Sequence, residues 1–197
     1  MPKRVPASRK QTWSWQLKIE LLGVTPSVWR RITVPETIKL SKLHAVFQTA
    51  LGWTNSHLHE FIIGGVRYAD PDPDPDLADE LEHVDQKNVV LAKALGLDSR
   101  CFDYVYDFGD DWHHIVIVEE QIPDRDVAPS LIHCSDGANR CPPEDVGSTR
   151  GYAEFLEAIA DPQHEEHDRY LHWVGGHFDP TRFDIDATNL ALSKIRI

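Results

Sequence analysis

One segment in the middle of the chain constrains the fold more than any other. Residues 104–120 read YVYDFGDDWHHIVIVEE. Two runs of residues flank a short turn, and in each run successive side chains alternate between two faces. Alternation with period two is typical of a strand with one buried face, and Gly109 and Asp110 tolerate the backbone angles of a tight turn. The segment therefore predicts a β-hairpin, and its turn is rich in aspartate.

The first third of the chain predicts the element order β-β-α-β-β. Strict alternation, apolar spacings of three and four residues, and a Gly-Gly turn between two short apolar runs mark the successive elements. The expected elements are strands at 13–21 and 28–34, a helix at 40–51, and strands at 58–63 and 66–68. This order is that of a β-grasp-like sheet with one helix packed across it, and the central hairpin would extend that sheet.

The rest of the chain predicts loops and helices. Residues 70–86 carry eight acidic residues and alternating Asp-Pro, which favours an extended, solvated loop. Residues 121–150 read as loop-rich, and helices are expected at 151–160, 165–174 and 187–195. The expected fold is thus α+β, as a single domain over residues 12–197 behind a flexible basic arm at residues 1–11.

The composition bounds the partners and the location. The 197 residues carry a formal net charge of −12, a field that repels nucleic acid and acidic membranes. A protein or small-ligand partner is therefore favoured over nucleic acid. The sequence contains no long apolar run and no secretory signal pattern, and its three cysteines are an odd number, so we expect a cytoplasmic protein with no membrane partner.

The hairpin turn is the first candidate site. Carboxylates this close in sequence repel one another unless a metal ion, an arginine or backbone N–H groups compensate them. The alternative is that the aspartates build the turn through side-chain to backbone hydrogen bonds. The candidate residues are Asp107, Asp110, Asp111, Trp112 and His113.

Two histidines before the third expected strand are the second candidate. On a strand, His57 and His59 would point to one face about 7 Å apart, where one metal ion could bind both imidazoles. The alternative is a pair of polar residues at a strand start. With the hairpin acids, the candidate metal ligands are His57, His59, Asp107 and Asp111, and a divalent metal is the candidate cofactor.

A third candidate lies in residues 133–147, HCSDGANRCPPEDVG. If 136–139 form a four-residue loop, Cys134 faces Cys141, which in a cytoplasm would be a dithiol, half of a zinc site or simple packing. Glu144 and Asp145 are placed rigidly by two preceding prolines. They could complete a ligand or partner face with the hairpin acids, or cap the following helix.

Four sequence blocks resemble the plasmid pRiA4b ORF-3-like family. They are WRRITVPETIKLSKLHAVFQTALGWTNSHLHEF, YVYDFGDDWHHIVIVE, CPPEDVGSTRGYAEFLEAIADPQHEEH and WVGGHFDPTRFD, which together span residues 29–184. The resemblance implies an α+β fold in a bacterial or archaeal cytoplasmic protein of plasmids and mobile elements, sometimes labelled resolvase-like. The matching motif positions are Asp107, Gly109, Asp110, Asp111, Trp112, Pro142, Pro143, Glu144 and Asp145.

Three functions fit these observations. The first is a binding or accessory protein that acts through the acidic hairpin face, because no complete catalytic motif is present. The second is a metal-dependent hydrolase or nuclease that uses the Asp/His cluster. The third is a DNA-associated transposition accessory protein, which the net charge opposes. A recombinase would also need a nucleophilic serine or tyrosine set among arginines, a setting that the serines of this chain lack.

Overall fold

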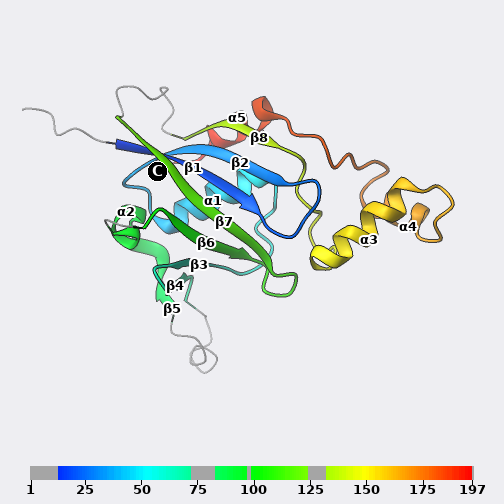
Figure 1. Ribbon diagram of the computed structural model, residues 1–197, viewed down its shortest axis with the longest axis horizontal. Helices are drawn as coiled ribbons and strands as arrows, with labels where there is room; N and C mark the ends of the chain where they lie inside the picture. Colours follow the sequence, from blue (N-terminus) through cyan, green and yellow to red (C-terminus); the bar gives the residue numbers. More distant parts are fainter. Residues whose placement is uncertain (1–12, 72–82, 97–98, 124–131, 197) are drawn as a thin grey trace, which may run out of the picture.

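The structure is a computed structural model that describes residues 13–71, 83–96, 99–123 and 132–196. The described strands form one eight-stranded sheet in the order β5-β4-β3-β6-β7-β1-β2-β8 (Figure 1). The strands are β1 (Trp13–Leu21), β2 (Val28–Pro35), β3 (His59–Ile63), β4 (Val66–Ala69), β5 (His83–Asp85), β6 (Cys101–Tyr106), β7 (Trp112–Pro123) and β8 (His133–Ala138). The helices are α1 (Leu40–Leu51), α2 (Leu91–Leu95), α3 (Ser148–Ala160), α4 (His167–Trp173) and α5 (Ile185–Leu192), with a 3-10 turn η1 (Gln86–Asn88).

The predicted α+β fold is confirmed, and the central hairpin lies in the middle of the sheet. Strands β6 and β7 pair with each other, β6 pairs with β3, and β7 pairs with β1, all antiparallel. The hairpin is therefore inserted between the two N-terminal strand pairs, rather than added outside them. A central position explains why its inward side chains Tyr104, Tyr106 and Trp112 are fully buried.

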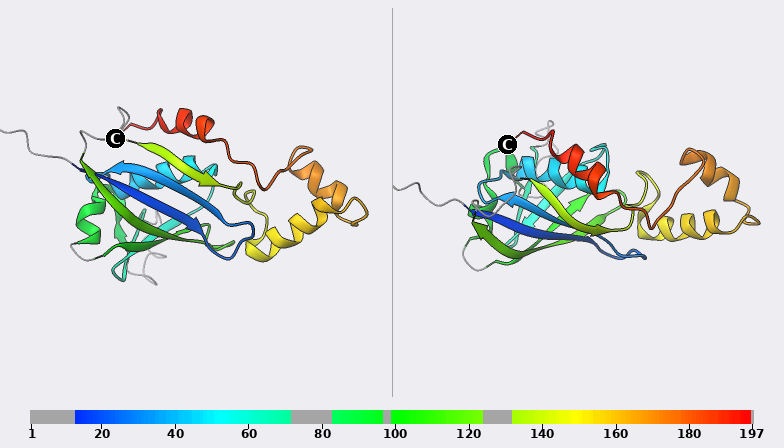
Figure 2. Two further views of the ribbon diagram at one scale, coloured as in Figure 1. Left: turned by 45° about the horizontal axis from the view of Figure 1, so that its top comes forward. Right: turned by 90° about the horizontal axis from the view of Figure 1, so that it is seen from above.

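Helix α1 covers one face of the sheet, as Figure 2 shows. Its apolar residues recur at three- and four-residue spacings, and Leu40, Leu43 and Phe47 are all completely buried. In β1 the alternation predicted from the sequence places Leu17 and Ile19 in the same core. The helix and the inward faces of the strands thus share one hydrophobic layer.

The opposite face of the sheet carries charged side chains. Lys18 pairs with Glu20 at 2.7 Å along β1, and Arg31 of β2 pairs with Glu119 of β7 at 2.7 Å. Ile117 on the same strand is 40% exposed. An antiparallel sheet with one apolar and one polar face is the expected result of a period-two pattern.

Several predicted boundaries need correction. Residues Asp136–Ala138 were expected in a loop, but they belong to β8, which pairs with β2. The expected acidic loop 70–86 ends in β5, which runs parallel to β4; residues 72–82 of that loop and the expected basic arm 1–11 lie outside the described residues. Helix α4 is shorter than predicted, and α5 begins and ends two to three residues earlier.

The C-terminal helices occupy two places. Helices α3 and α4 pack on each other at one end of the molecule, beyond the strands, whereas α5 lies beside β8 (Figures 1 and 2). The side chain of Asn189 on α5 accepts from Cys134 N and donates to Cys134 O, so it satisfies part of the outer edge of β8. Within the described segments, we find no helix with the length and apolar character that a bilayer crossing requires.

Candidate metal centre

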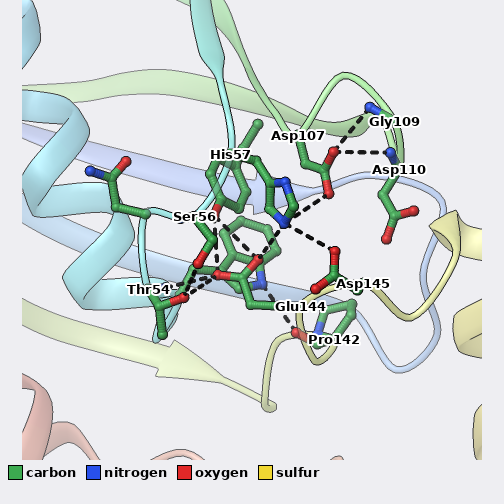
Figure 3. Close-up of polar contacts among 12 residues, drawn as sticks. Thr54, Ser56, His57, Asp107, Gly109, Asp110, Pro142, Glu144 and Asp145 are labelled. Carbon is green, nitrogen blue, oxygen red and sulfur yellow. Dashed lines mark hydrogen bonds and ion pairs between the residues drawn. The ribbon is translucent and has the colours of Figure 1, made fainter.

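Four acidic or imidazole side chains from three segments converge at one end of the central hairpin (Figure 3). The Nε2 atom of His57 lies 3.1 Å from Asp145 Oδ1, 3.6 Å from Asp107 Oδ2 and 3.9 Å from Glu144 Oε2. One ligand atom from each of His57, Asp107 and Asp145 lies within 4.8 Å of the others. The sequence proposed all four residues as candidates: it joined His57 with Asp107 as possible metal ligands, and Glu144 and Asp145 with Asp107 as a possible ligand face.

Strand pairing brings His57 and Asp107 together. Strand β3 begins two residues after His57, β6 ends one residue before Asp107, and the two strands pair with His59 opposite Tyr106. The amide of Asp107 donates to Leu58 O at 2.8 Å, which extends the ladder by one bond. The two side chains therefore leave the same end of the sheet from adjacent strands.

Asp107 uses its two carboxylate oxygens for different purposes. Oδ1 accepts from the amides of Gly109 (3.0 Å) and Asp110 (3.3 Å), which builds the turn. Oδ2 points to His57 instead. The residue has a left-handed backbone, φ 58°, which aspartate tolerates better than most side chains. Turn building and ligation were posed as alternatives for this aspartate, but its geometry permits both.

Glu144 is held in place by neighbours that the sequence did not single out. Its Oε1 accepts from Thr54 N at 2.8 Å, Thr54 Oγ1 at 3.0 Å and Tyr106 Oη at 3.1 Å. The loop that carries it is anchored where Trp53 Nε1 donates to Pro142 O. Its Oε2 accepts from Tyr106 Oη at 3.2 Å and is the oxygen that faces His57, at 3.9 Å. The alternation of β6 predicts that Tyr106 faces the core, but no sequence pattern predicts that Thr54 contacts Glu144.

The phenol of Tyr106 links two of the converging segments. It accepts from Ser56 N at 3.0 Å and donates to Glu144. Burial raises the pKa of Tyr106 to about 12, and the adjacent Glu144 carboxylate adds to the shift. The hydrogen bond from Ser56 N–H opposes it. The phenol is therefore protonated at neutral pH and is able to orient the carboxylate.

Asp110 holds the loop before α3, which carries Asp145, against the hairpin turn. Asp110 Oδ2 accepts from Gly147 N at 3.1 Å, which ties the turn to the residue before α3. Asp145 has a left-handed backbone, φ 61°, and its side chain is 72% exposed. Asp145 thus forms the solvent side of the cluster, whereas Asp107 forms its buried side.

The Nε2 atom of His57 lies at the centre of this cluster. Its Nε2 is inaccessible to solvent and makes no contact with hydrogen-bond geometry, although Asp145 Oδ1 lies 3.1 Å away. An imidazole nitrogen that is buried, unpaired and surrounded by carboxylate oxygens is costly unless a proton or a cation sits there. The donor set of one nitrogen and up to three carboxylates suits a divalent metal such as Zn²⁺ or Mn²⁺.

The other proposed ligands lie elsewhere. His59 is buried, stacks on His44 with ring centroids 3.4 Å apart, and its Nε2 pairs with Gln86. His57 precedes β3 at a bend, so the expectation that it shares a strand face with His59 is wrong. Asp111 is exposed beyond the turn, and its amide donates to Asp107 O.

Two further members of the proposed face have structural positions. Trp112 is completely buried and packs near Trp53, with ring centroids 6.2 Å apart, so it belongs to the core and not to a binding face. His113 lies opposite Val105 in the hairpin and pairs at 3.0 Å with Asp103, a diagonal neighbour on β6, so it does not reach the cluster.

The cysteines form no part of this centre. Cys134 and Cys141 are free and buried, and burial raises the pKa of both thiols, that of Cys141 to about 12. Cys134 Sγ donates to Asp136 O at 3.3 Å. The four-residue loop that was expected to align the two thiols is absent because β8 continues to Ala138.

Comparison with known proteins agrees with the sequence blocks. The family described as plasmid pRiA4b ORF-3-like protein matches residues 14–187. The chain belongs to this family. Within the pRiA4b ORF-3-like match lie all four residues of the cluster.

Two relatives extend this comparison. The uncharacterized protein y4hQ of Sinorhizobium fredii (strain NBRC 101917 / NGR234) is 40% identical over 183 residues, which cover 91% of each chain. A crystal structure of a protein of unknown function, MM3350 from Methanosarcina mazei Go1, aligns with a TM-score of 0.78 at 32% identity. That alignment covers 90% of this chain and 98% of the other, so the pRiA4b ORF-3-like fold extends over nearly the whole length of both proteins.

Proposed function

We propose that the protein binds a divalent metal ion at His57, Asp107, Glu144 and Asp145 and that the bound ion supports hydrolysis. The observation that carries the proposal is the buried Nε2 of His57, which makes no hydrogen bond and faces three carboxylate oxygens within 3.9 Å. Carboxylates this close repel one another, and a divalent ion would compensate their charge while it accepts the lone pair of the neutral His57 imidazole.

The surroundings support a site that is built for a metal. Glu144 and Asp107 are each oriented by hydrogen bonds on the oxygen that faces away from His57. Such outer contacts fix the direction of a metal ligand and strengthen binding. Asp145 is exposed, so the cluster has a solvent side on which a water or a substrate group can reach the ion.

Hydrolysis is the chemistry that this arrangement fits. A divalent ion with three or four protein ligands and an open position lowers the pKa of a bound water to about 7. Two apolar side chains, Leu58 (65% exposed) and Phe108 (49% exposed), follow His57 and Asp107 directly in sequence. They would give a substrate an apolar contact next to the ion.

The same exposed pair favours a second candidate, recognition of a protein or small ligand by the hairpin end without catalysis. The amide of Asp107, the residue before Phe108, donates to Leu58 O. The side chains of Leu58 and Phe108 therefore leave adjacent backbone segments. Metal binding without turnover of any ester or phosphoester would favour this candidate. Direct DNA binding gains nothing from the site, because its converging groups are acidic.

Calorimetric titration of the tag-free, chelator-treated protein with Zn²⁺ and Mn²⁺ tests the proposal. We expect one ion per chain, with binding strongly weakened in His57→Ala and weakened in Asp145→Asn. His113→Ala is the matched control, because His113 also pairs with a carboxylate on the hairpin but lies outside the cluster. Equal metal binding by His57→Ala and the unmodified protein would reject the site.

A chromogenic ester and a phosphodiester then test the chemistry. Turnover that needs added metal and disappears in His57→Ala, but not in His113→Ala, would support the hydrolase. Metal binding without any such turnover would leave recognition as the function.

A further inference from the structure

A pocket on a different part of the molecule is rich in arginine. It has a volume of about 280 Å³ and lies between the C-terminal end of α1, the segment after β8 and the start of α5. Arg30, Arg140 and Arg182 all line it, together with Asp184. Three cations against one carboxylate is an unusual excess in a chain whose net charge is −12.

Arg30 is the buried part of this group. It is 2% exposed, and its guanidinium donates to four backbone carbonyls: those of Ala50, Trp29, Ala138 and Asn139, at 2.7–2.8 Å. These bonds use four of its five N–H groups. Among the described residues, no carboxylate forms an ion pair with it, so carbonyl dipoles and an aromatic ring, and not an opposite charge, stabilise the guanidinium.

The plane of the Arg30 guanidinium is fixed. It stacks on the ring of Phe183, with the guanidinium carbon 3.9 Å from the centroid. The absence of a side chain at Gly137 permits this, since a Cβ there would lie 2.7 Å from Phe183 and 2.9 Å from Arg30 Cδ. A guanidinium that is held rigid before a ligand arrives loses little entropy on binding.

The two exposed arginines form no close ion pair, although Arg182 lies near Asp179: hydrogen bonds from Thr181, and more weakly the charges of His177 and Arg182, lower the pKa of that carboxyl. Within the described part of the chain, neither Arg140 nor Arg182 forms an ion pair, and Arg140 stacks over Phe178 at 4.4 Å. Asp184, the acid in the lining, is engaged as the cap of α5, where it accepts from Ala187 N at 2.9 Å. The guanidinium groups of Arg140 and Arg182 are therefore free of close ion pairs and can donate to a ligand.

We propose that this pocket binds a small molecule through a phosphate or carboxylate group held by Arg140 and Arg182, while Arg30 adds its buried positive charge and the one N–H group that the carbonyls leave unused. Guanidinium groups match both oxyanions with paired N–H donors. The site is separate from the metal cluster and does not depend on it.

Thermal unfolding with inorganic phosphate and with malonate, at ionic strength kept constant with sodium chloride, tests this inference. We expect a saturable rise in Tm with at least one of the two anions, and none in the double variant Arg140→Gln/Arg182→Gln. Both replaced side chains are exposed, so the variant should fold, which circular dichroism checks. Arg150→Gln is the control, because Arg150 is exposed on α3 and already pairs with Glu154.

Each outcome decides the inference. A response to phosphate alone assigns a phosphorylated ligand, and a response to malonate alone assigns a carboxylate ligand. An equal rise in Tm in the double variant would identify a general salt effect and overturn the site, as would the absence of a response to both anions in the unmodified protein. His57→Ala should respond as the unmodified protein does, which separates this result from that of the metal site.

Discussion

Asp107 Oδ2 lies 3.6 Å from His57 Nε2 because β6, which ends just before Asp107, and β3, which begins just after His57, are neighbours in the sheet. The pairing of His59 with Tyr106 fixes the separation, and the bond from Asp107 N to Leu58 O extends the register to the site itself. The metal-binding proposal thus depends on rigid sheet geometry for two of its ligands, and on a docked loop for the other two.

Tyr106→Phe should weaken metal binding without removing a ligand. The change deletes the bond that orients Glu144 and the one that accepts from Ser56 N. Loss of such an outer contact lowers metal affinity by about 10- to 100-fold. Calorimetry with Zn²⁺ measures it, and Tyr104→Phe is the control, since that phenol bonds to Gln48 and His44 inside the core. Matched affinities in the two variants would argue against an orienting role.

Gly151→Ala should disturb the loop that carries Glu144 and Asp145. A Cβ at Gly151 would lie 2.2 Å from Val146 O, so the loop or the helix must move. We expect a loss of about 3 kcal/mol of stability in urea unfolding and weaker metal binding. Ala153→Gly, on an exposed position of α3, should cost about 1 kcal/mol through helix propensity and leave the metal affinity unchanged.

Acid should destabilise the protein through its buried histidines. Burial, and secondly the neighbouring His59, lower the pKa of His44 to about 4, and burial lowers that of His114 to about 3. In the unfolded chain both imidazoles take up protons below about pH 6.5, whereas in the folded chain they stay neutral. Stability should therefore fall as the pH drops from 6.5 towards 4, by on the order of 2 kcal/mol per histidine at pH 4.5.

Urea unfolding as a function of pH measures this slope. His44→Gln removes one of the buried histidines whose pKa is lowered, so the slope between pH 6.5 and 4.5 should become shallower. His164→Gln, at an exposed position, should leave the slope unchanged. The same slope in both variants would contradict a neutral buried His44.

Glu60 should hold the outer strands β4 and β5 to the sheet. It is 5% exposed and pairs with Arg67 of β4 and, at 3.1 Å, with His83 of β5. Glu60→Gln presents an amide N–H to one of these donors, so we expect a loss of about 2 kcal/mol and faster hydrogen exchange in β4 and β5. Glu20→Gln, in a surface pair, should change stability by less than about 0.5 kcal/mol. Unchanged exchange in β4 would contradict the anchoring role of Glu60.

The local patterns predicted the strands better than the site. Alternation placed β1, β6 and β7, and the helix spacing placed α1, because both depend on neighbours in sequence. The position of the hairpin at the centre of the sheet depends on which strands pair across long distances. The convergence of His57 with Asp107 follows from that pairing, so the sequence could suggest both as metal ligands but could not tell that Glu144 and Asp145 join them in place of His59 and Asp111.

The missed strand β8 has a specific cause. Asp136-Gly137 is a turn signal, but here Gly137 lies inside a strand because Phe183 and Arg30 approach its backbone closely. The grouping of His57 with His59 failed for a related reason, since period two applies only once a strand has begun. Contacts from distant residues decided both cases, and local propensity cannot encode them.

X-ray absorption at the zinc edge of the zinc-loaded protein tests the metal site most directly. We predict nitrogen and oxygen ligands at about 2.0–2.2 Å, with imidazole scattering that disappears in His57→Ala. A sulfur shell at about 2.3 Å, or imidazole scattering that persists in His57→Ala, would show that the ion binds elsewhere and would contradict the proposed centre.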